Sequence, residues 1–260
     1  KLDILKTIPS FTYGLILGFL TGIPMGAKTS NDLLENNKIN YKEASFLLSI
    51  CNNPSPMFII NYITISQLNL PQIKYHILFI IYLSAIISGF ILKSITNESV
   101  CKNNNNLSEN TPNIKILNNN LHIQSTNNTD LFDFKTIDEA IMNGFEIITK
   151  VGGYIILFSI LSEILFNINY LNQYIKLTLI GLIEITNGVN KICLSDLNTN
   201  TKIVFVTIIA SFGGLSGLAQ TQSMISKSRL SIKSYFIVKL INIIVSTILV
   251  LLMLKLINIV

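Results

Sequence analysis

The chain has 260 residues, of which 50% are hydrophobic and only 13% are charged, and its mean hydropathy is +0.54. A soluble domain carries about 25% charged residues, so this composition excludes a water-soluble globular protein and indicates a polytopic membrane protein. The net charge of +5 then reflects cytoplasmic loops, which collect Lys and Arg, and not nucleic-acid binding. Three widely spaced cysteines and two histidines indicate no disulfide framework, no metal site and no histidine-based catalysis. No cofactor is expected.

The first apolar stretch, residues 13–30, combines small residues with a helix breaker: Gly14, Gly18, Gly22, Gly26 and Pro24. Glycines at every fourth position let a second backbone approach closely in lipid, and the proline interrupts the helix. Polar residues follow, beginning with Lys28, and 27–42 is predicted to be a loop. The pattern predicts a discontinuous transmembrane helix whose broken end, with Gly22, Pro24, Gly26 and Lys28, faces a solute or ion. Lys28 either attracts an anion or follows the positive-inside bias.

A second interruption lies at 51–56 inside the apolar segment 43–61. Pro54 and Pro56 cannot both lie in a regular helix interior. The neighbouring Asn52, Asn53 and Ser55 either hydrogen-bond a solute or cap the backbone groups that the break leaves free. We predict a discontinuous or re-entrant element here.

The middle of the chain is predicted to hold a plain span at 75–92, a polar Asn-rich loop at 94–131, an amphipathic interfacial helix at 132–148 and a further span at 151–168. Glu163 lies in this last span. An ionisable group in an apolar helix is costly and is often functional, so it is a candidate coupling residue.

The last third contains an apolar segment at 174–188, an interrupted one at 202–225 and a long span at 235–260. Glu184 is a candidate for carrying a coupling proton or cation. The alternative is a place at the membrane edge, in contact with water. Its companions, and the residues of the interruption, complete the predicted solute site: Thr186, Asn187, Gly213, Gly214, Ser216 and Gln220. Glycines there permit exposed N–H groups that suit a carboxylate. The alternative is a tight helix crossing that requires small residues.

The two ends of the chain contain the same features in the same order. From Gly26 to Ser55 is 29 positions, and from Gly188 to Ser216 is 28. We therefore predict an all-α protein of about six to eight transmembrane or re-entrant helices in two related halves, 1–93 and 149–260. The first half is expected to be incomplete, because Lys1 is not an initiator Met. Paired interruptions of this kind point to a transporter's binding site.

Charge indicates that the two halves are inverted. The segment 226–239 is predicted to be a cytoplasmic loop carrying Lys227, Arg229, Lys233 and Lys239, whereas 66–75 has only Lys74. Lys191, like Lys28, follows a break and either attracts an anion or obeys the same bias.

Two motifs resemble enzyme signatures but depart from them. Residues 22–29 approach a phosphate-binding loop, yet Ala27 replaces its second required Gly. Ser216 has Gly214 on one side, but Leu218 stands where a nucleophile elbow needs a second Gly. We therefore predict that the protein is not an enzyme.

Four ordered motifs, TGIPMGAK (21–28), NNPSPMFI (52–59), EITNG (184–188) and FGGLSGLAQ (212–220), resemble the sporulation integral membrane proteins of the YlbJ type. These belong to the wider group with a nucleoside-recognition, or gate, domain. The resemblance implies an all-helical, carrier-like protein in the cell membrane or outer forespore membrane of a spore-forming bacterium. It also implies dipicolinate as the cargo, moved between mother cell and forespore.

The predicted function is therefore a carrier in the lipid bilayer for a small anionic solute, coupled to a proton or cation through Glu184. A structural or assembly protein of the forespore membrane and a nucleoside-type carrier are the alternatives. A homo-oligomer is left open.

Overall fold

The computed structural model describes residues 9–103, 134–168, 172–226 and 228–257. Throughout these ranges the ordered elements are helices, and they contain no strand. Four helical segments of the described residues are long and apolar enough to cross a membrane: Pro71–Ser94, Ile137–Phe166, Thr199–Ile225 and Ile232–Leu256. The prediction of an all-α polytopic membrane protein is confirmed.

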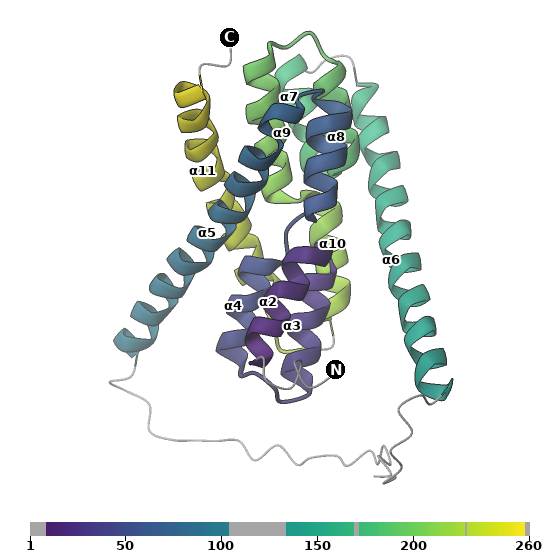
Figure 1. Cartoon of the computed structure of the whole chain (residues 1–260), viewed down its shortest axis with the longest axis vertical. Helices are drawn as coiled ribbons and strands as arrows, with labels where there is room; N and C mark the ends of the chain where they lie inside the picture. The colour runs from purple at the N-terminus through teal and green to yellow at the C-terminus, as the bar shows by residue number, and fades with distance from the viewer. Residues whose placement is uncertain (1–8, 104–133, 169–171, 227, 258–260) are drawn as a thin grey trace.

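The first half begins with a helical hairpin at the lower end of the molecule (Figure 1). Helix α2 (Ser10–Thr21) rises to the break at Gly22–Pro24, and α3 (Met25–Glu35) returns beside it. Helix α4 (Tyr41–Cys51) then rises to the second break, after which the π-helix η1 (Phe58–Gln67) continues to the upper end. A short turn, η2 (Pro71–Ile73), leads into α5 (Lys74–Asn103), which descends again.

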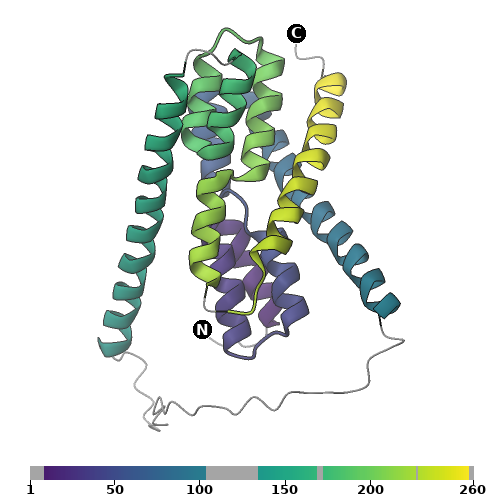
Figure 2. The ribbon, with the colours of Figure 1, turned by 180° about the vertical axis from the view of Figure 1, so that it is seen from behind.

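The second half repeats this path upside down. Helices α7 (Gln173–Ile183) and α8 (Ile185–Leu194) form a hairpin at the upper end. Helix α9 (Thr199–Phe212) descends to a break at Gly213, α10 (Gly214–Ile225) continues to the lower end, and α11 (Ile232–Ile257) rises. Helix α6 (Phe134–Phe166) lies along one side and joins the lower end to the upper (Figure 2).

Glycines allow the helices of each hairpin to approach closely. A Cβ added to Gly188 in α8 would lie 2.1 Å from Cα of Gly181 in α7, so the two backbones are in direct contact. In the first half, a Cβ on Gly14 of α2 would lie 2.7 Å from Cδ1 of Leu33 in α3, and a Cβ on Gly18 would lie 2.6 Å from Sγ of Cys51 in α4. Close backbone approach of this kind is how helices associate in lipid. The predicted close-packing role of the early glycines is met at Gly14 and Gly18, both buried.

The long helices α5 and α11 cross and pack against each other at mid-height, to one side of the two hairpins. One apolar cluster, which includes Ile59, Ile77 and Ile203, joins η1, α5 and α9 above the breaks. A second cluster, which includes Leu47 and Tyr235, joins α4 to α11 below them. The breaks therefore lie between two apolar cores.

The structure differs from the sequence prediction in the polar segment after the first break. Residues 27–42 were predicted to be a loop, which is wrong, because α3 covers most of them. Its polar side chains bond along the helix itself: Thr29 Oγ1 donates to Met25 O at 2.9 Å and Ser30 Oγ to Gly26 O at 2.8 Å. Polar composition therefore did not exclude a helix.

Two further boundaries differ. Helix α5 continues beyond the predicted end at Leu92 to Asn103, and the rest of the Asn-rich segment lies outside the described residues. The interfacial helix at 132–148 and the span at 151–168 are one continuous helix, α6, from Phe134 onwards. No proline separates them, and Gly152 and Gly153 remain within the helix.

Candidate functional site

The breaks of the two halves come together near the middle of the molecule. Within the first half, the N–H of Ile23 donates to Asn53 O at 3.0 Å, so the hairpin tip contacts the α4–η1 break. Within the second half, a Cβ added to Gly214 would lie 3.4 Å from the carbonyl oxygen of Ile183, beside the α7–α8 break. Between the halves, Cδ1 of Ile23 would lie 3.0 Å from a Cβ at Gly213.

The two hairpin tips share one type of backbone hydrogen bond. In the first, the N–H of Gly26 donates to Gly22 O at 3.0 Å, and in the second, the N–H of Gly188 donates to Glu184 O at 3.0 Å. Gly22, with a φ of 79°, needs the freedom of glycine, because a Cβ there would lie 2.7 Å from Ser55 N. Gly22 and Glu184 therefore occupy equivalent places in the two halves.

Asn52 joins three helices at the α4–η1 break. Its Oδ1 accepts from the N–H of Ala27 at 3.2 Å, and its Nδ2 donates to Thr221 Oγ1 at 2.8 Å and to the Tyr235 hydroxyl oxygen at 2.9 Å. The Tyr235 hydroxyl in turn donates to Asn52 O at 2.9 Å. Asn52 is fully buried, so this network fixes α3, α10 and α11 around the break.

Asn53 connects the break to a buried lysine that the sequence analysis placed elsewhere. Lys239 Nζ donates to Asn53 Oδ1 at 2.8 Å and to Ser211 O at 3.4 Å, and its side chain is 0% exposed. Lys239 falls in the overlap of the span predicted at 235–260 and the loop predicted at 226–239, and it was counted among the cations of that cytoplasmic loop. That prediction is wrong, because α11 begins at Ile232 and Lys239 lies two turns inside it. Among the described residues, no carboxylate lies within 4.0 Å of its Nζ.

Two more polar side chains beside Lys239 have open hydrogen-bonding positions. Asn242 Nδ2 donates to the same Ser211 O at 3.0 Å. Asn242 Oδ1 and Ser211 Oγ are buried and lack a hydrogen-bond partner. Ser211 and Asn242 were not predicted from the sequence as site residues, and Lys239 was predicted only as a loop cation. The available signal was a lysine and an asparagine three residues apart, on one face of an otherwise apolar helix.

Glu184 is the extended residue between α7 and α8, with φ −142° and ψ 123°, and it is 1% exposed. It lies neither within a helix nor at the membrane edge, as the sequence analysis had considered, but at a buried break. Its carboxylate caps α8, since Oε2 accepts from the N–H of Asn187 at 2.8 Å and from the Thr186 hydroxyl. Asn187 Nδ2 reaches Ser162 Oγ of α6 at 2.8 Å, and Thr186 O accepts from the Tyr62 hydroxyl at 2.9 Å.

The remaining residues of the interruptions have structural contacts. Ser55 Oγ accepts from the N–H of Phe58 at 3.3 Å, which caps the start of η1. Ser216 Oγ accepts from Gln220 Nε2 at 3.0 Å, and both side chains are buried within α10. Gly213 and Gly214 have φ values of 87° and 72°, a left-handed backbone that a residue with Cβ rarely adopts.

The two lysines that follow the hairpin tips form ion pairs away from the breaks. Lys28 Nζ lies 3.2 Å from Asp32 Oδ2, one turn along α3. Lys191 Nζ lies 3.2 Å from Glu163 Oε2. All four side chains are at least a quarter exposed. The structure therefore does not bring Lys28, Lys191 or Glu163 to the buried polar residues at the breaks.

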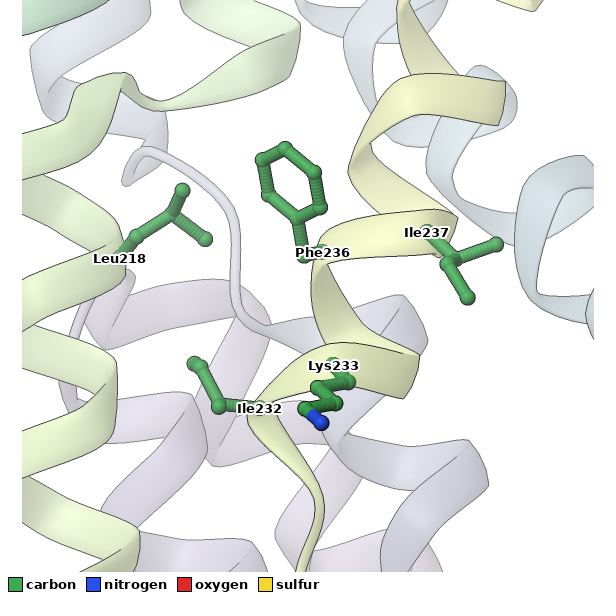
Figure 3. Close-up of a pocket in the computed structure, with 5 residues that line it drawn as sticks. All are labelled: Leu218, Ile232, Lys233, Phe236 and Ile237. Atoms are coloured by element: carbon green, nitrogen blue, oxygen red, sulfur yellow. The ribbon is translucent and has the colours of Figure 1, made fainter.

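A hollow of about 340 Å³ lies between α10 and the start of α11 (Figure 3), lined by Leu218, Ile232, Lys233, Phe236 and Ile237. It includes none of the predicted site residues. The side chains of Asn52, Asn53, Glu184 and Ser216 are instead buried and bonded to their neighbours. Access to the breaks therefore requires the surrounding helices to separate.

The chain is 25% identical over 245 residues to the sporulation integral membrane protein YlbJ of Bacillus subtilis (strain 168). The match covers 88% of this chain and 60% of that protein, so the chain spans about three fifths of the length of this curated relative. It confirms the resemblance to YlbJ-type proteins that the four motifs indicated. No family model matches the chain, and no solved structure matches it.

Proposed function

We propose that this chain, which resembles YlbJ-type sporulation membrane proteins, acts in sporulation as a carrier for a small anionic solute. The observation that carries the proposal is the contact between Lys239 and Asn53. It joins a buried cation in α11 of the second half to the helix break of the first. Interrupted helices within a bilayer are tolerated where they are buried in protein or line a cavity, and paired interruptions in inverted halves mark the binding sites of carriers.

Transport would proceed by movement of one half against the other. The contacts that close the site run between the halves, such as the hydrogen bonds of Asn52 with Thr221 and Tyr235. Breaking them would expose Lys239 and Asn53 to one side of the membrane. Alternating access of this kind is the common mechanism of carriers built from inverted repeats.

Dipicolinate is the first solute to test, on the strength of the resemblance and of the sporulation function that the relative's name prints. It carries two carboxylates, of which Lys239 could balance one. A coupled proton or cation, held by the buried carboxylate of Glu184, would supply further positive charge. The outer forespore membrane is the proposed location. A nucleoside-type carrier would not need a buried lysine.

The test is dipicolinate uptake into vesicles that contain the full-length protein. We expect uptake above that of empty vesicles, driven by a proton or cation gradient. Glu184→Gln should weaken this dependence on the gradient, because the amide keeps an oxygen for the Asn187 N–H but cannot ionise. Ser55→Ala tests the predicted site at the first break, where Ser55 caps η1, and Lys233→Met, at an exposed position of α11, is the control.

Uptake equal to that of empty vesicles under every ion gradient would remove the carrier proposal for dipicolinate. If a panel of other anions and nucleosides gave the same result, the structural or assembly alternative would be favoured.

A further inference from the structure

We infer that Lys239, Ser211 and Asn242 form the binding site for the carboxylate of the transported solute. This inference rests on the proposed function and assigns the atoms that would recognise the solute. All three residues are buried, and they meet at Ser211 O, which accepts from both Lys239 Nζ and Asn242 Nδ2.

Lys239 lacks a counter-charge beside it among the described residues. A lysine inside a membrane-spanning helix is costly, and such residues usually pair with an opposite charge or with backbone carbonyls. The partners of Lys239 are neutral oxygens, Asn53 Oδ1 and Ser211 O. The described residues place no carboxylate within 4.0 Å of it. A solute carboxylate would supply the missing counter-charge through a charge-assisted hydrogen bond.

Two buried polar atoms beside Lys239 have open hydrogen-bonding positions, an observation that does not depend on charge. More than nine in ten buried polar groups have a hydrogen-bond partner, yet Ser211 Oγ and Asn242 Oδ1 have none. The serine hydroxyl can donate to a carboxylate oxygen. The amide oxygen can accept from a donor on the solute, such as a protonated second carboxyl group.

These positions define a chemical class. One ammonium balances one negative charge, so the site fits a small acid that binds with a single ionised carboxylate and one further hydrogen-bond donor. A singly protonated dicarboxylic acid meets both requirements. A neutral molecule of the same shape does not.

The experiment measures binding apart from transport. The melting temperature of the full-length protein in detergent is followed at constant ionic strength, against pyridine-2,6-dicarboxylate and its uncharged diamide. The dicarboxylate should raise the melting temperature and the diamide should not. Lys239→Met should weaken the apparent affinity at least about tenfold, and Ser211→Ala about threefold to tenfold.

Two variants make the result interpretable. Lys233→Met is the matched control, because Lys233 lies in the same helix but is exposed, and it should bind like the unmodified protein. Ser211→Ala removes only a hydroxyl that lacks a partner, so it should fold normally and test the site independently of Lys239.

The outcomes separate this inference from the proposed function. If Lys239→Met and Ser211→Ala both bound the dicarboxylate as tightly as the unmodified protein, the site would be overturned. The proposed carrier function would then need a site elsewhere in the chain. Binding that is lost in both variants, together with no uptake into vesicles, would support a carboxylate site at these residues and overturn its part in transport. A melting temperature of the unmodified protein that the dicarboxylate leaves unchanged would also overturn the site.

Discussion

Two buried ionisable residues, the basic Lys239 and the acidic Glu184, lie beside the breaks, and they are not paired with each other. Lys239 contacts the first-half break through Asn53, whereas the Glu184 carboxylate caps α8. Each is therefore held by neutral groups of the protein. Structural ion pairs are usually held close, as in Lys28–Asp32 at the surface. Under the proposed function, the two residues would bind separate species, the solute at Lys239 and the coupling proton or cation at Glu184.

At this residue scale, Lys239→Met should make the protein more stable. Placing a lysine in the membrane interior costs about 2.5–3.5 kcal/mol of free energy, and the methionine variant would not incur this cost. The variant would instead leave Asn53 Oδ1 without its donor, which costs about 1–2 kcal/mol. The net gain is about 0.5–2.5 kcal/mol, and each kcal/mol raises the melting temperature by about 2–4 °C. Thermal unfolding in detergent without ligand checks this, with Lys233→Met as the neutral control. A lower melting temperature than that control would mean that Lys239 serves the fold.

The residues at the site were only partly predictable. Asn52 and Asn53 stand beside two prolines and are rare polar residues in an apolar segment, so the sequence indicated them. Lys239 follows three other cations in a polar stretch and was therefore assigned to a loop. Its burial depends on where α11 starts, and the boundary of a helix is the least certain part of a sequence prediction.

The hairpins depend on small residues where their two helices touch. Gly188 and Gly181 bring α8 and α7 into backbone contact, and the tip of the hairpin carries Glu184 to the centre. The sequence predicted the interruptions from prolines and glycines. It did not predict that the chain reverses at Gly22–Pro24 and at Glu184, because a break and a reversal leave the same local signal, and tertiary contacts decide between them.

At the element scale, Gly188→Ala and Gly153→Ala should have opposite effects. An alanine in a helix is favoured over glycine by about 0.5–1 kcal/mol, and a Cβ on Gly153 of α6 meets nothing within 4 Å. Gly153→Ala should therefore stabilise the protein slightly. A Cβ on Gly188 would lie 2.1 Å from Gly181 Cα, so Gly188→Ala should destabilise it by about 1–3 kcal/mol through overpacking. Melting temperatures of the two variants in detergent check this. Equal shifts would contradict the close hairpin.

The second half of the molecule is inverted relative to the first because α6 crosses from the lower end to the upper end. Helix α5 ends the first half at the lower end, and without a further crossing the second half would start there too. Helix α6 carries the chain to the upper end, so α7 and α8 enter from the opposite side (Figures 1 and 2). The sequence indicated inversion from loop charges, and Lys239 does not count among them. The inversion depends on the single long helix α6 between the two halves. In the sequence prediction this helix was divided into two parts.

At this scale the proposed mechanism requires the halves to separate, and a cross-link between them should stop it. A Cβ added at Gly217 lies 3.7 Å from Cγ2 of Ile23, which is bonded to the Ile23 Cβ. The Ile23 Cβ itself lies more than 4 Å from that added Cβ, so two cysteines here need a small approach of α10 and the hairpin tip to reach the distance of about 3.5–4.5 Å that a disulfide needs. The pair Ile23→Cys and Gly217→Cys, with Cys51, Cys101 and Cys193 replaced by Ala, should form a disulfide on mild oxidation.

Solute uptake into vesicles should then fall to the level of empty vesicles and return when the disulfide is reduced. Each single-cysteine variant is the control, because it occupies the same space but cannot bridge α10 and the first hairpin. Binding of pyridine-2,6-dicarboxylate to the oxidised protein should be slow or lost, because the buried lysine cannot be reached while the halves are held together. Unchanged uptake by fully cross-linked protein would show that solute does not pass between the two halves, and the contact of Ile23 with Gly213 and Gly217 would then be a fixed part of the fold.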